Sequence, residues 1–174
     1  MNQLLLSGQW GENLQWELYR CDDMPDVTLC TAVFCLAVLP ETQHVVLARN
    51  HRGWEMLGGH IEPNETIEQA MIRECLEEGG YTPEHYQLFG YRKIITTNPV
   101  PHNQVPGGFY PFPHSYIPYF VATSRLPLLA AAGLEIVESR AFSFSELEVI
   151  GGDQWPFRKI MLDFYLQQRA AALI

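Results

Sequence analysis

The feature that most constrains the fold is a short, well-delimited helix whose last turns carry several glutamates. Residues 59–81 read GHIEPNETIEQAMIRECLEEGGY. Thr66 and Gln69 form the capping-box pattern T-x-x-Q that opens many helices, and the glycine pair at 79–80 supplies the left-handed conformation that closes them. These signals predict a helix over residues 67–78 that packs through one face against the body of the protein.

Three acids, Glu74, Glu77 and Glu78, lie at positions i, i+3 and i+4 of this helix. Such neighbours repel one another by roughly a few tenths of a kcal/mol, and the negative end of the helix dipole adds about 0.3–1 kcal/mol for each. At 100° per residue they share an arc of about 100° with the apolar face, which holds Ile67, Ala70 and Met71. Because carboxylates that face a protein's interior need a partner, the pattern predicts a metal ion or a basic group there.

The segment also matches a known signature, G-x5-E-x7-R-E-U-x-E-E-x-G-U, in which U is a bulky apolar residue. Its fixed positions hold Gly59, Glu65, Arg73, Glu74, Glu77, Glu78 and Gly80, and its apolar positions hold Cys75 and Tyr81. The chain therefore resembles the Nudix hydrolases. The preceding residues 54–59, WEMLGG, resemble the strand and double-glycine turn that lead into this signature, with Leu57 where a proline is common.

The resemblance implies a site for Mg²⁺, with Mn²⁺ as a substitute. The implied ligands are Glu74, Glu77, Glu78 and the backbone carbonyl of Gly59. A divalent ion neutralises the charge that develops when a pyrophosphate link is hydrolysed, and it lowers the pKa of a bound water. The expected chemistry is attack of that water on the diphosphate bridge.

By the same resemblance, Glu65 and Arg73 have a bracing role between the loop and the helix, and Arg73 can also reach Glu77 one turn away. The carboxylate that activates water is left open. The candidates are Glu78, Glu135 and Glu138. The last two lie in the apolar stretch LEIVESRAF, where solvation of a strand edge explains them equally well.

Apolar patterning predicts the remaining elements. Strands are expected at 28–39, 44–48, 87–97, 116–123 and 138–144, with a turn at 40–43. A second helix is expected over 157–168 with Pro156 at its first position and an apolar face of Ile160, Met161, Phe164 and Tyr165. Strands interleaved with two helices predict a layered α/β domain. The resemblance implies an α/β/α sandwich around a mixed β-sheet, which we expect to be one domain over residues 1–174.

The composition of the chain limits the cellular compartments and the binding partners that we expect for it. A chain of 174 residues that is 47% hydrophobic can bury a sizeable core, and it contains no apolar run long enough for a membrane helix. The formal charge of −9 disfavours non-specific binding to nucleic acid. The four cysteines lack C-x-x-C spacing and are expected to be reduced. We therefore expect a cytoplasmic protein with a small-molecule nucleotide as its partner, no DNA and no membrane; a homodimer is left open.

Residues 98–118 carry six of the twelve prolines and are interpreted as a long binding loop that sets specificity. Its rings Phe109, Tyr110 and Phe112 are candidates for stacking on a substrate base. The other interpretation, that these rings pin the loop to the core, is at least as good, since aromatic rings bury large apolar areas. His60, next to Gly59, is a further candidate for contacting the substrate.

The predicted function is Mg²⁺-dependent hydrolysis of a nucleoside diphosphate linked to another moiety, a class that includes nucleotide sugars, ADP-ribose-like compounds and nucleoside triphosphates. Two alternatives belong to other classes. One is a non-catalytic nucleotide sensor, which usually has an eroded acid cluster, whereas this cluster is complete. The other is an RNA 5′-end pyrophosphohydrolase, which needs a basic track that only Arg92 and Lys93 hint at.

Overall fold

A mixed sheet of nine strands forms the middle layer of the molecule in a computed structural model that describes residues 2–97, 111–124 and 138–171. The strands are β1 (Gln3–Trp10), β2 (Leu14–Arg20), β3 (Ala32–Leu39), β4 (His44–Asn50), β5 (Gly53–Glu55), β6 (Leu57–His60), β7 (His85–Thr96), β8 (His114–Thr123) and β9 (Glu138–Ser143). The helices are α1 (Ile67–Gly79), α2 (Phe144–Gly151) and α3 (Trp155–Ala170), with short 3-10 turns at Val27–Leu29 and Gly152–Gln154.

The sheet runs in the order β1-β2-β7-β8-β3-β4-β5, with β6 beside β3 and β9 beside β4. The β3–β8 pair is parallel, and the other strand pairs named here are antiparallel. Strand β3 therefore has β8 along one side and β4 and β6 along the other. This position makes β3 the centre of the sheet and brings β6 next to it.

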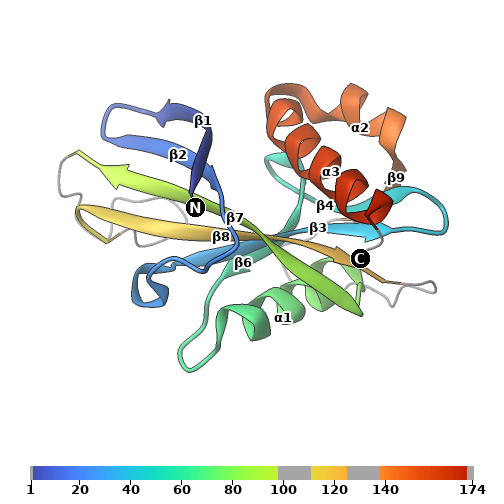
Figure 1. Ribbon diagram of the computed structural model, residues 1–174, viewed down its shortest axis with the longest axis horizontal. Coiled ribbons are helices and arrows are strands. Elements are labelled where there is room, and N and C mark those ends of the chain that lie inside the picture. Colours follow the sequence, from blue (N-terminus) through green and yellow to red (C-terminus); the bar gives the residue numbers. More distant parts are fainter. Residues whose placement is uncertain (1, 98–110, 125–137, 172–174) are drawn as a thin grey trace.

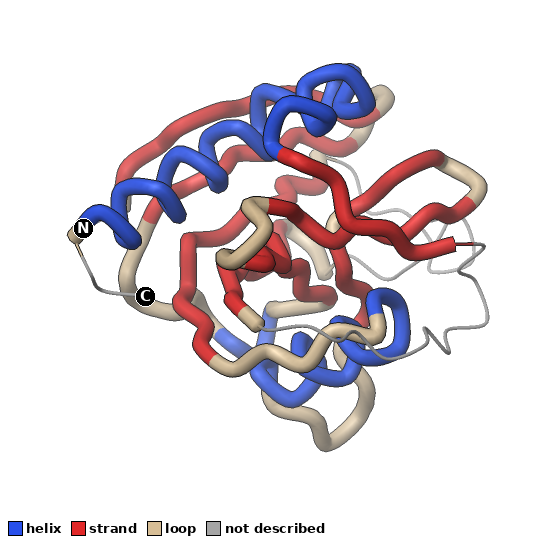
Figure 2. The backbone as a smooth tube through the Cα atoms, turned by 90° about the vertical axis from the view of Figure 1, so that its right-hand side faces the viewer, coloured by secondary structure: helices blue, strands red, loops and turns tan. Residues whose placement is uncertain are grey.

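The two faces of β3 are buried under different helices, as its near-continuous apolar sequence predicts. One set of alternating residues, which includes Val33 and Cys35, packs with Met71 and Cys75 of α1. The other set, which includes Leu36 and Val38, packs with residues of α3. Figure 1 shows α1 below the sheet and α2 and α3 above it, and Figure 2 shows the same three layers from the side. The expected α/β/α arrangement is confirmed.

Helix α1 begins and ends where its sequence signals predict. The Thr66 side chain accepts from the Gln69 amide, and the Gln69 side chain accepts from the Thr66 amide, so both halves of the capping box are present. Gly80 takes the left-handed conformation with φ 60°, and its amide donates to the Leu76 carbonyl at 3.0 Å. A residue with a Cβ is disfavoured in that conformation, which explains why glycine closes the helix.

Most of the other predicted elements are confirmed with small shifts at their ends. The strands expected at 44–48 and 87–97 are β4 and β7, and the helix expected over 157–168 is α3, which extends further at both ends. Proline occupies the first turn of α3 as expected. Of the predicted apolar face of α3, Met161, Phe164 and Tyr165 are buried and Ile160 is partly buried.

Three predicted boundaries are wrong. The strand expected from residue 28 begins at Ala32, because Val27–Leu29 form a 3-10 turn capped by the Asp26 side chain. Phe144 belongs to α2, since Ser143 caps that helix. The loop expected over 98–118 ends before His114, where β8 starts; its residues 98–110 lie outside the described part. Pro118 lies within β8, opposite Tyr91 of β7.

Two further elements were not predicted. The β1–β2 hairpin forms one edge of the sheet, and α2 follows β9 directly. Both carry signals: Leu14, Trp16 and Leu18 alternate with polar residues, and Ser143 and Glu146 form a capping box.

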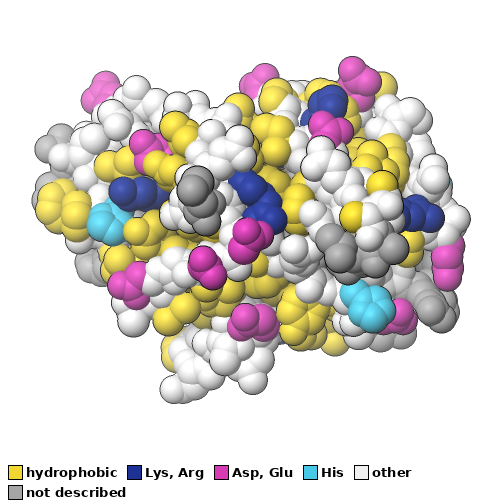
Figure 3. Space-filling model, in the orientation of Figure 1, with side chains coloured by type: hydrophobic (Ala, Val, Ile, Leu, Met, Phe, Trp, Pro, Cys, Tyr) yellow, Lys and Arg dark blue, Asp and Glu magenta, His cyan; other side chains and the backbone are white. Residues whose placement is uncertain are grey.

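The lengths of the helices can be compared with the prediction that the chain has no membrane helix. No helix in the described ranges is long and apolar enough to cross a membrane. Acidic side chains are scattered between apolar areas over the face shown in Figure 3.

A buried tyrosine hydroxyl ties the end of α1 to the sheet, and its removal tests this link. The Tyr81 hydroxyl lies 2.8 Å from the Val38 carbonyl and 2.9 Å from the Ala122 carbonyl. Tyr81→Phe should lower the free energy of unfolding by about 1 kcal/mol, which corresponds to a Tm lower by about 2–4 °C. Tyr165→Phe is the matched control: its hydroxyl is buried and has no hydrogen-bond partner among the described residues, so its loss should leave stability equal or higher. Urea denaturation measures both, and equal losses would refute the assignment.

Candidate functional site

The predicted site forms where β6 passes the middle of α1. Gly59 of β6 pairs with Val33 of β3, and a Cβ placed on Gly59 would lie 2.5 Å from Oε1 of Glu74. Only glycine therefore allows the backbone and this carboxylate to approach so closely. Of the predicted metal-ligand residues, Gly59 and Glu74 are brought into direct contact distance.

Arg73 is the centre of the polar contacts in the site. Its Nε and Nη2 donate to the two carboxylate oxygens of Glu65 at 2.7 and 3.0 Å. Its Nη1 donates to Glu74 at 2.8 Å and to Glu77 at 3.1 Å. Nη2 also donates to the carbonyl of His60 at 3.0 Å. One guanidinium therefore joins the loop before α1, the end of β6 and the acidic face of α1.

Glu78 binds the first residue of the double glycine, Gly58. Its Oε2 accepts from the backbone amide of Gly58 at 2.8 Å. This contact links the last turn of α1 to β6, twenty residues earlier in the chain. Gly58 was not predicted as a site residue, although its place in the double glycine could have identified it.

The pKa values of Glu65 and Glu74 are shifted in opposite directions. The hydrogen bond from Arg73 holds the pKa of Glu65 below its ordinary value, so this carboxylate stays ionised as a brace. Burial raises the pKa of Glu74, although Arg73 opposes this effect. The hydrogen bonds that Arg73 donates to Glu65, Glu74 and Glu77 raise its own pKa. Glu74 is thus the desolvated acid of the cluster, and one that a further cation would stabilise.

The donor set fits a hard divalent cation in its chemistry. Mg²⁺ prefers carboxylate and carbonyl oxygens, which are what Glu74, Glu77, Glu78 and Gly59 offer. Glu74 and Glu77 already converge on one positive atom, Nη1 of Arg73. Within the described ranges, however, no three His, Cys, Asp or Glu side chains are arranged as a metal-holding group. Binding an ion here requires the carboxylates to divide their oxygens between Arg73 and the metal.

The remaining predicted site residues lie apart from this network or outside the described part. His60 ends β6 with an exposed side chain, and Phe112 is 58% exposed just before β8. Glu138 begins the edge strand β9 and forms an ion pair with Arg49 at 3.9 Å, with both side chains about half exposed. Phe109, Tyr110 and Glu135 lie outside the described residues.

Arg158 of α3 positions the segment that leads into β6, and sequence reasoning missed it. Its side chain is 2% exposed, donates to the Trp54 carbonyl and lies 3.7 Å from the Glu55 carboxylate. Burial lowers the pKa of Arg158, and Glu55 opposes this shift. In the sequence, Arg158 is one charged residue within an amphipathic helix, so no pattern identifies it.

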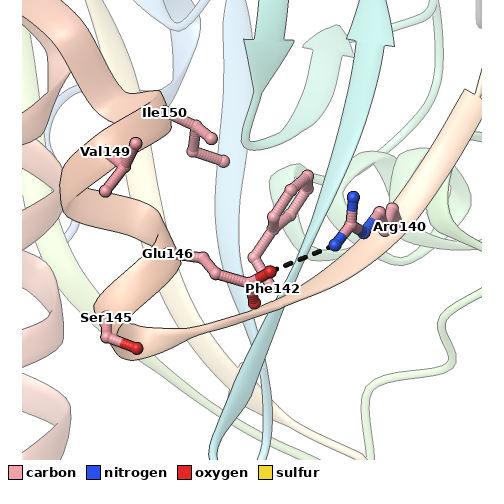
Figure 4. A pocket seen from close by; sticks show the side chains of 6 residues that line it. All are labelled: Arg140, Phe142, Ser145, Glu146, Val149 and Ile150. Carbon is pink, nitrogen blue, oxygen red and sulfur yellow. Dashed lines mark hydrogen bonds and ion pairs between the residues drawn. The ribbon is translucent and has the colours of Figure 1, made fainter.

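A surface pocket of about 430 Å³ lies between β9 and α2, away from the predicted acids (Figure 4). It is lined by Arg140, Phe142, Ser145, Glu146, Val149 and Ile150. Arg140 covers the Phe142 ring at 4.6 Å and pairs with Glu146 at 3.1 Å, so its charge is already compensated. None of the predicted catalytic residues lines this pocket.

Comparisons with known proteins agree with the fold. A family model described as NUDIX domain matches residues 28–164. Over 35 residues the chain is 57% identical to the 8-oxo-dGTP diphosphatase of Escherichia coli (strain K12), which is 20% of this chain and 27% of that protein. Over 134 residues it is 24% identical to the NAD-capped RNA hydrolase NudC of Photorhabdus laumondii, which is 74% of this chain and 46% of that protein. The crystal structure of the Bacillus subtilis pyrophosphohydrolase BsRppH matches with a TM-score of 0.58 at 19% identity, over 79% of this chain and 77% of that one.

The class defined by the fold and the acid cluster is that of α/β/α proteins in which a double-glycine strand meets an acidic helix. Because the family model matches most of its length, the chain belongs to the NUDIX domain family, and the prediction from the signature is confirmed. The solved structure supports the fold. The chain spans about a quarter to a half of the length of these two curated relatives.

The Arg73–Glu65 pair should contribute measurably to stability, and a double-mutant cycle tests it. Both side chains are about four-fifths buried and their bond is bidentate, so Arg73→Met and Glu65→Gln should show a coupling energy of about 1–2 kcal/mol. The matched control is Lys159–Asp163 at 2.6 Å, a pair on α3 that is about half exposed. Its cycle should give only about 0.3–0.5 kcal/mol. Equal coupling in the two cycles would contradict a bracing role for Arg73.

The buried charge of Glu74 should make stability depend on pH in the absence of metal. Because burial raises its pKa, the folded protein binds a proton more tightly than the unfolded chain. The contribution of Glu74 to stability is therefore greatest at low pH and is lost as pH rises from about 4.5 through the raised pKa. In EDTA, the Tm of Glu74→Gln minus that of the wild type should rise across this window. A difference that stays flat or falls would show that the Glu74 charge is fully compensated by Arg73.

Proposed function

We propose that the protein is a metal-dependent pyrophosphohydrolase that acts on nucleoside diphosphates linked to another moiety. The observation that carries this proposal is the convergence of the desolvated Glu74 and of Glu77 on one positive atom beside Gly59. The acids of such a cluster repel one another within the helix, and the single charge of Arg73 compensates them only in part. Membership of the NUDIX domain family supports the same reaction.

The proposed cofactor is Mg²⁺, with Mn²⁺ as a substitute. Glu74, Glu77, Glu78 and the Gly59 carbonyl would hold it. When bound, the ion neutralises charge on the diphosphate and lowers the pKa of a water. Arg73 keeps Glu74 and Glu77 oriented, and Glu65 keeps Arg73 in place through two hydrogen bonds.

Among the candidates for the group that accepts the proton of the attacking water, Glu78 is supported best. Its Oε2 is held by the Gly58 amide next to Gly59, so its position relative to the proposed metal site is fixed. Glu138 is engaged with Arg49 at the edge of β9 instead. Glu135 stays a candidate outside the described residues.

The substrate class is supported by relatives, one a diphosphatase of a modified nucleoside triphosphate and the other a hydrolase of NAD-capped RNA. Both named substrates contain a nucleotide with a phosphoanhydride link. The second relative matches three quarters of this chain, which keeps an RNA 5′ end as the alternative substrate.

The test is release of phosphate or nucleotide from a panel of nucleoside triphosphates, nucleotide sugars, ADP-ribose, dinucleotides and 5′-capped RNA, with and without Mg²⁺. Glu77→Gln combined with Glu78→Gln should lower kcat/KM by about two orders of magnitude or more and weaken Mg²⁺ binding while the fold stays intact. Glu68→Gln, in the first turn of α1 away from the cluster, is the matched control and should keep full activity.

Two outcomes would contradict the proposal. Full turnover by the double variant would refute the metal-ligand assignment. Tight binding of one compound without turnover of any would instead support a nucleotide sensor.

A further inference from the structure

The last residue of α1, Gly79, lies directly against a leucine of β6. A Cβ placed on Gly79 would lie 2.5 Å from Cδ1 of Leu57 and 3.1 Å from its Cδ2. Gly79 is buried, and Leu57 is 0% exposed. The helix and the strand can therefore approach each other this closely only because residue 79 has no side chain.

The formation of the helix does not explain this glycine. In the signature G-x5-E-x7-R-E-U-x-E-E-x-G-U, residue 79 is one of the free positions. The left-handed conformation that closes α1 is taken by Gly80, whereas Gly79 is still helical. Because glycine disfavours a helix relative to alanine, its presence at position 79 carries a cost. The contact with Leu57, which stands where a proline is common, accounts for it.

The contact lies beside the hydrogen bond that joins the same two elements. Glu78 precedes Gly79 and Gly58 follows Leu57, and the Gly58 amide donates to Oε2 of Glu78 at 2.8 Å. A second close approach between α1 and β6 occurs where Gly59 faces a carboxylate of the helix. The helix thus contacts the strand at two glycines, one from each element, and these contacts set the distance between the two backbones.

The strand has little freedom to move away from the helix, because it packs closely against β3. Leu57 and Gly58 both pair with β3 in the antiparallel ladder. A Cβ on Gly58 would overlap the Val33 carbonyl, so the two strands are already at their closest approach. The Leu57 side chain belongs to the core cluster beneath α1, and a densely packed core leaves it little room to turn aside. Added volume at residue 79 should therefore move the end of α1 away from β6.

The earlier part of the acidic face is held by other contacts. Arg73 binds Glu65 through two hydrogen bonds and also binds the carbonyl of His60. These bonds lie one to two turns before Gly79 and do not involve it. A tilt of the helix end should therefore lengthen the contact between Glu78 and the Gly58 amide first.

We propose that Gly79 and Leu57 are positioning residues for Glu78, because their contact sets the distance at which its carboxylate meets the Gly58 amide. This role rests on the proposed function, which assigns Glu78 as a metal ligand and as the best supported acceptor of the proton from water. Such an acceptor must stay within hydrogen-bond reach of the water, and a displacement of about 1 Å can cost about a hundredfold in rate.

A volume-conserving exchange between the two residues separates the contact from other effects. Gly79→Ala adds one methyl group that meets Leu57, although alanine itself favours the helix. Leu57→Val removes the two methyl groups nearest to the added one and leaves atoms near the place of Cγ, which is 3.4 Å from that Cβ. The double variant Gly79→Ala with Leu57→Val therefore keeps the number of carbon atoms and removes the overlap.

Amide hydrogen exchange of Gly58 in EDTA reports the position of Glu78 without metal or substrate, because this amide donates to Glu78. Its exchange should be about tenfold faster in Gly79→Ala than in the wild type. In the double variant it should return to within about threefold of the wild type. Leu76→Ala, which shortens an exposed side chain of α1, is the matched control and should keep the wild-type exchange.

Steady-state kinetics at saturating Mg²⁺ test the consequence for the reaction. With the best substrate of the panel, Gly79→Ala should lower kcat by about tenfold or more and keep KM within about twofold, since the displaced group acts on the water. The double variant should recover kcat. If Gly79→Ala does not fold, Gly79→Ala with Leu57→Ile replaces it, because this pair again carries one carbon atom more than the wild type, and it should change exchange and kcat in the same directions.

Three results would overturn the proposal. They are unchanged exchange of Gly58 in Gly79→Ala, faster exchange that Leu57→Val fails to reverse, and faster exchange with an unchanged kcat. Failure of the proposed function gives a different result, in which the wild type turns over no compound of the panel. The exchange of Gly58 then still decides whether the contact between Gly79 and Leu57 positions Glu78.

Discussion

The arrangement of the site depends on one guanidinium, that of Arg73. It has five donor hydrogens in a fixed plane, and it uses them on Glu65, Glu74, Glu77 and the His60 carbonyl. A lysine at this position would supply the charge but could not hold the loop, the strand end and the helix together. One positive charge facing three carboxylates leaves an excess of negative charge on this side of α1. The divalent ion proposed for this site would neutralise that excess beside Gly59.

The position of the site follows from how the core is built around β3. Because both faces of β3 are apolar, one face holds α1 and the other holds α3, and β6 runs along its edge. Met71 and Cys75, which anchor α1 in the core, lie on the same helix as the acids. Burying these apolar side chains therefore also fixes where the acids lie. Glu78 then closes the contact between α1 and β6 through the Gly58 amide. The positions of the acids are thus set by the packing of the core and by two contacts with the backbone of β6, that of Glu78 with the Gly58 amide and that of Arg73 with the His60 carbonyl.

Sequence reasoning succeeded where the controlling interactions are local and failed where they are distant. The ends of α1 were predictable because a capping box and a C-terminal glycine act within one turn of the helix. The pairing of Arg73 with Glu65, eight residues earlier, followed from the family signature and not from helical spacing. The parallel β3–β8 pairing and the packing of the Trp10 and Phe157 rings on Arg92 join residues up to about 150 positions apart, and no pattern within a short window encodes them.

Buried arginines are costly in any fold, and among its described residues this chain, with a formal charge of −9, buries two of them on one side of the sheet. Arg92 and Arg158 are both buried on the side of the sheet that carries α3, and each has a nitrogen without a hydrogen-bond partner. Burying an uncompensated ion costs several kcal/mol, whereas each cation–π contact returns about 0.5–2 kcal/mol, so the four aromatic rings around Arg92 can offset most of its cost but not supply the missing hydrogen bond. Arg158 recovers part of its cost from Glu55 and the Trp54 carbonyl, which Arg92 lacks. The unsatisfied Nε of Arg92 is therefore retained at a cost to stability.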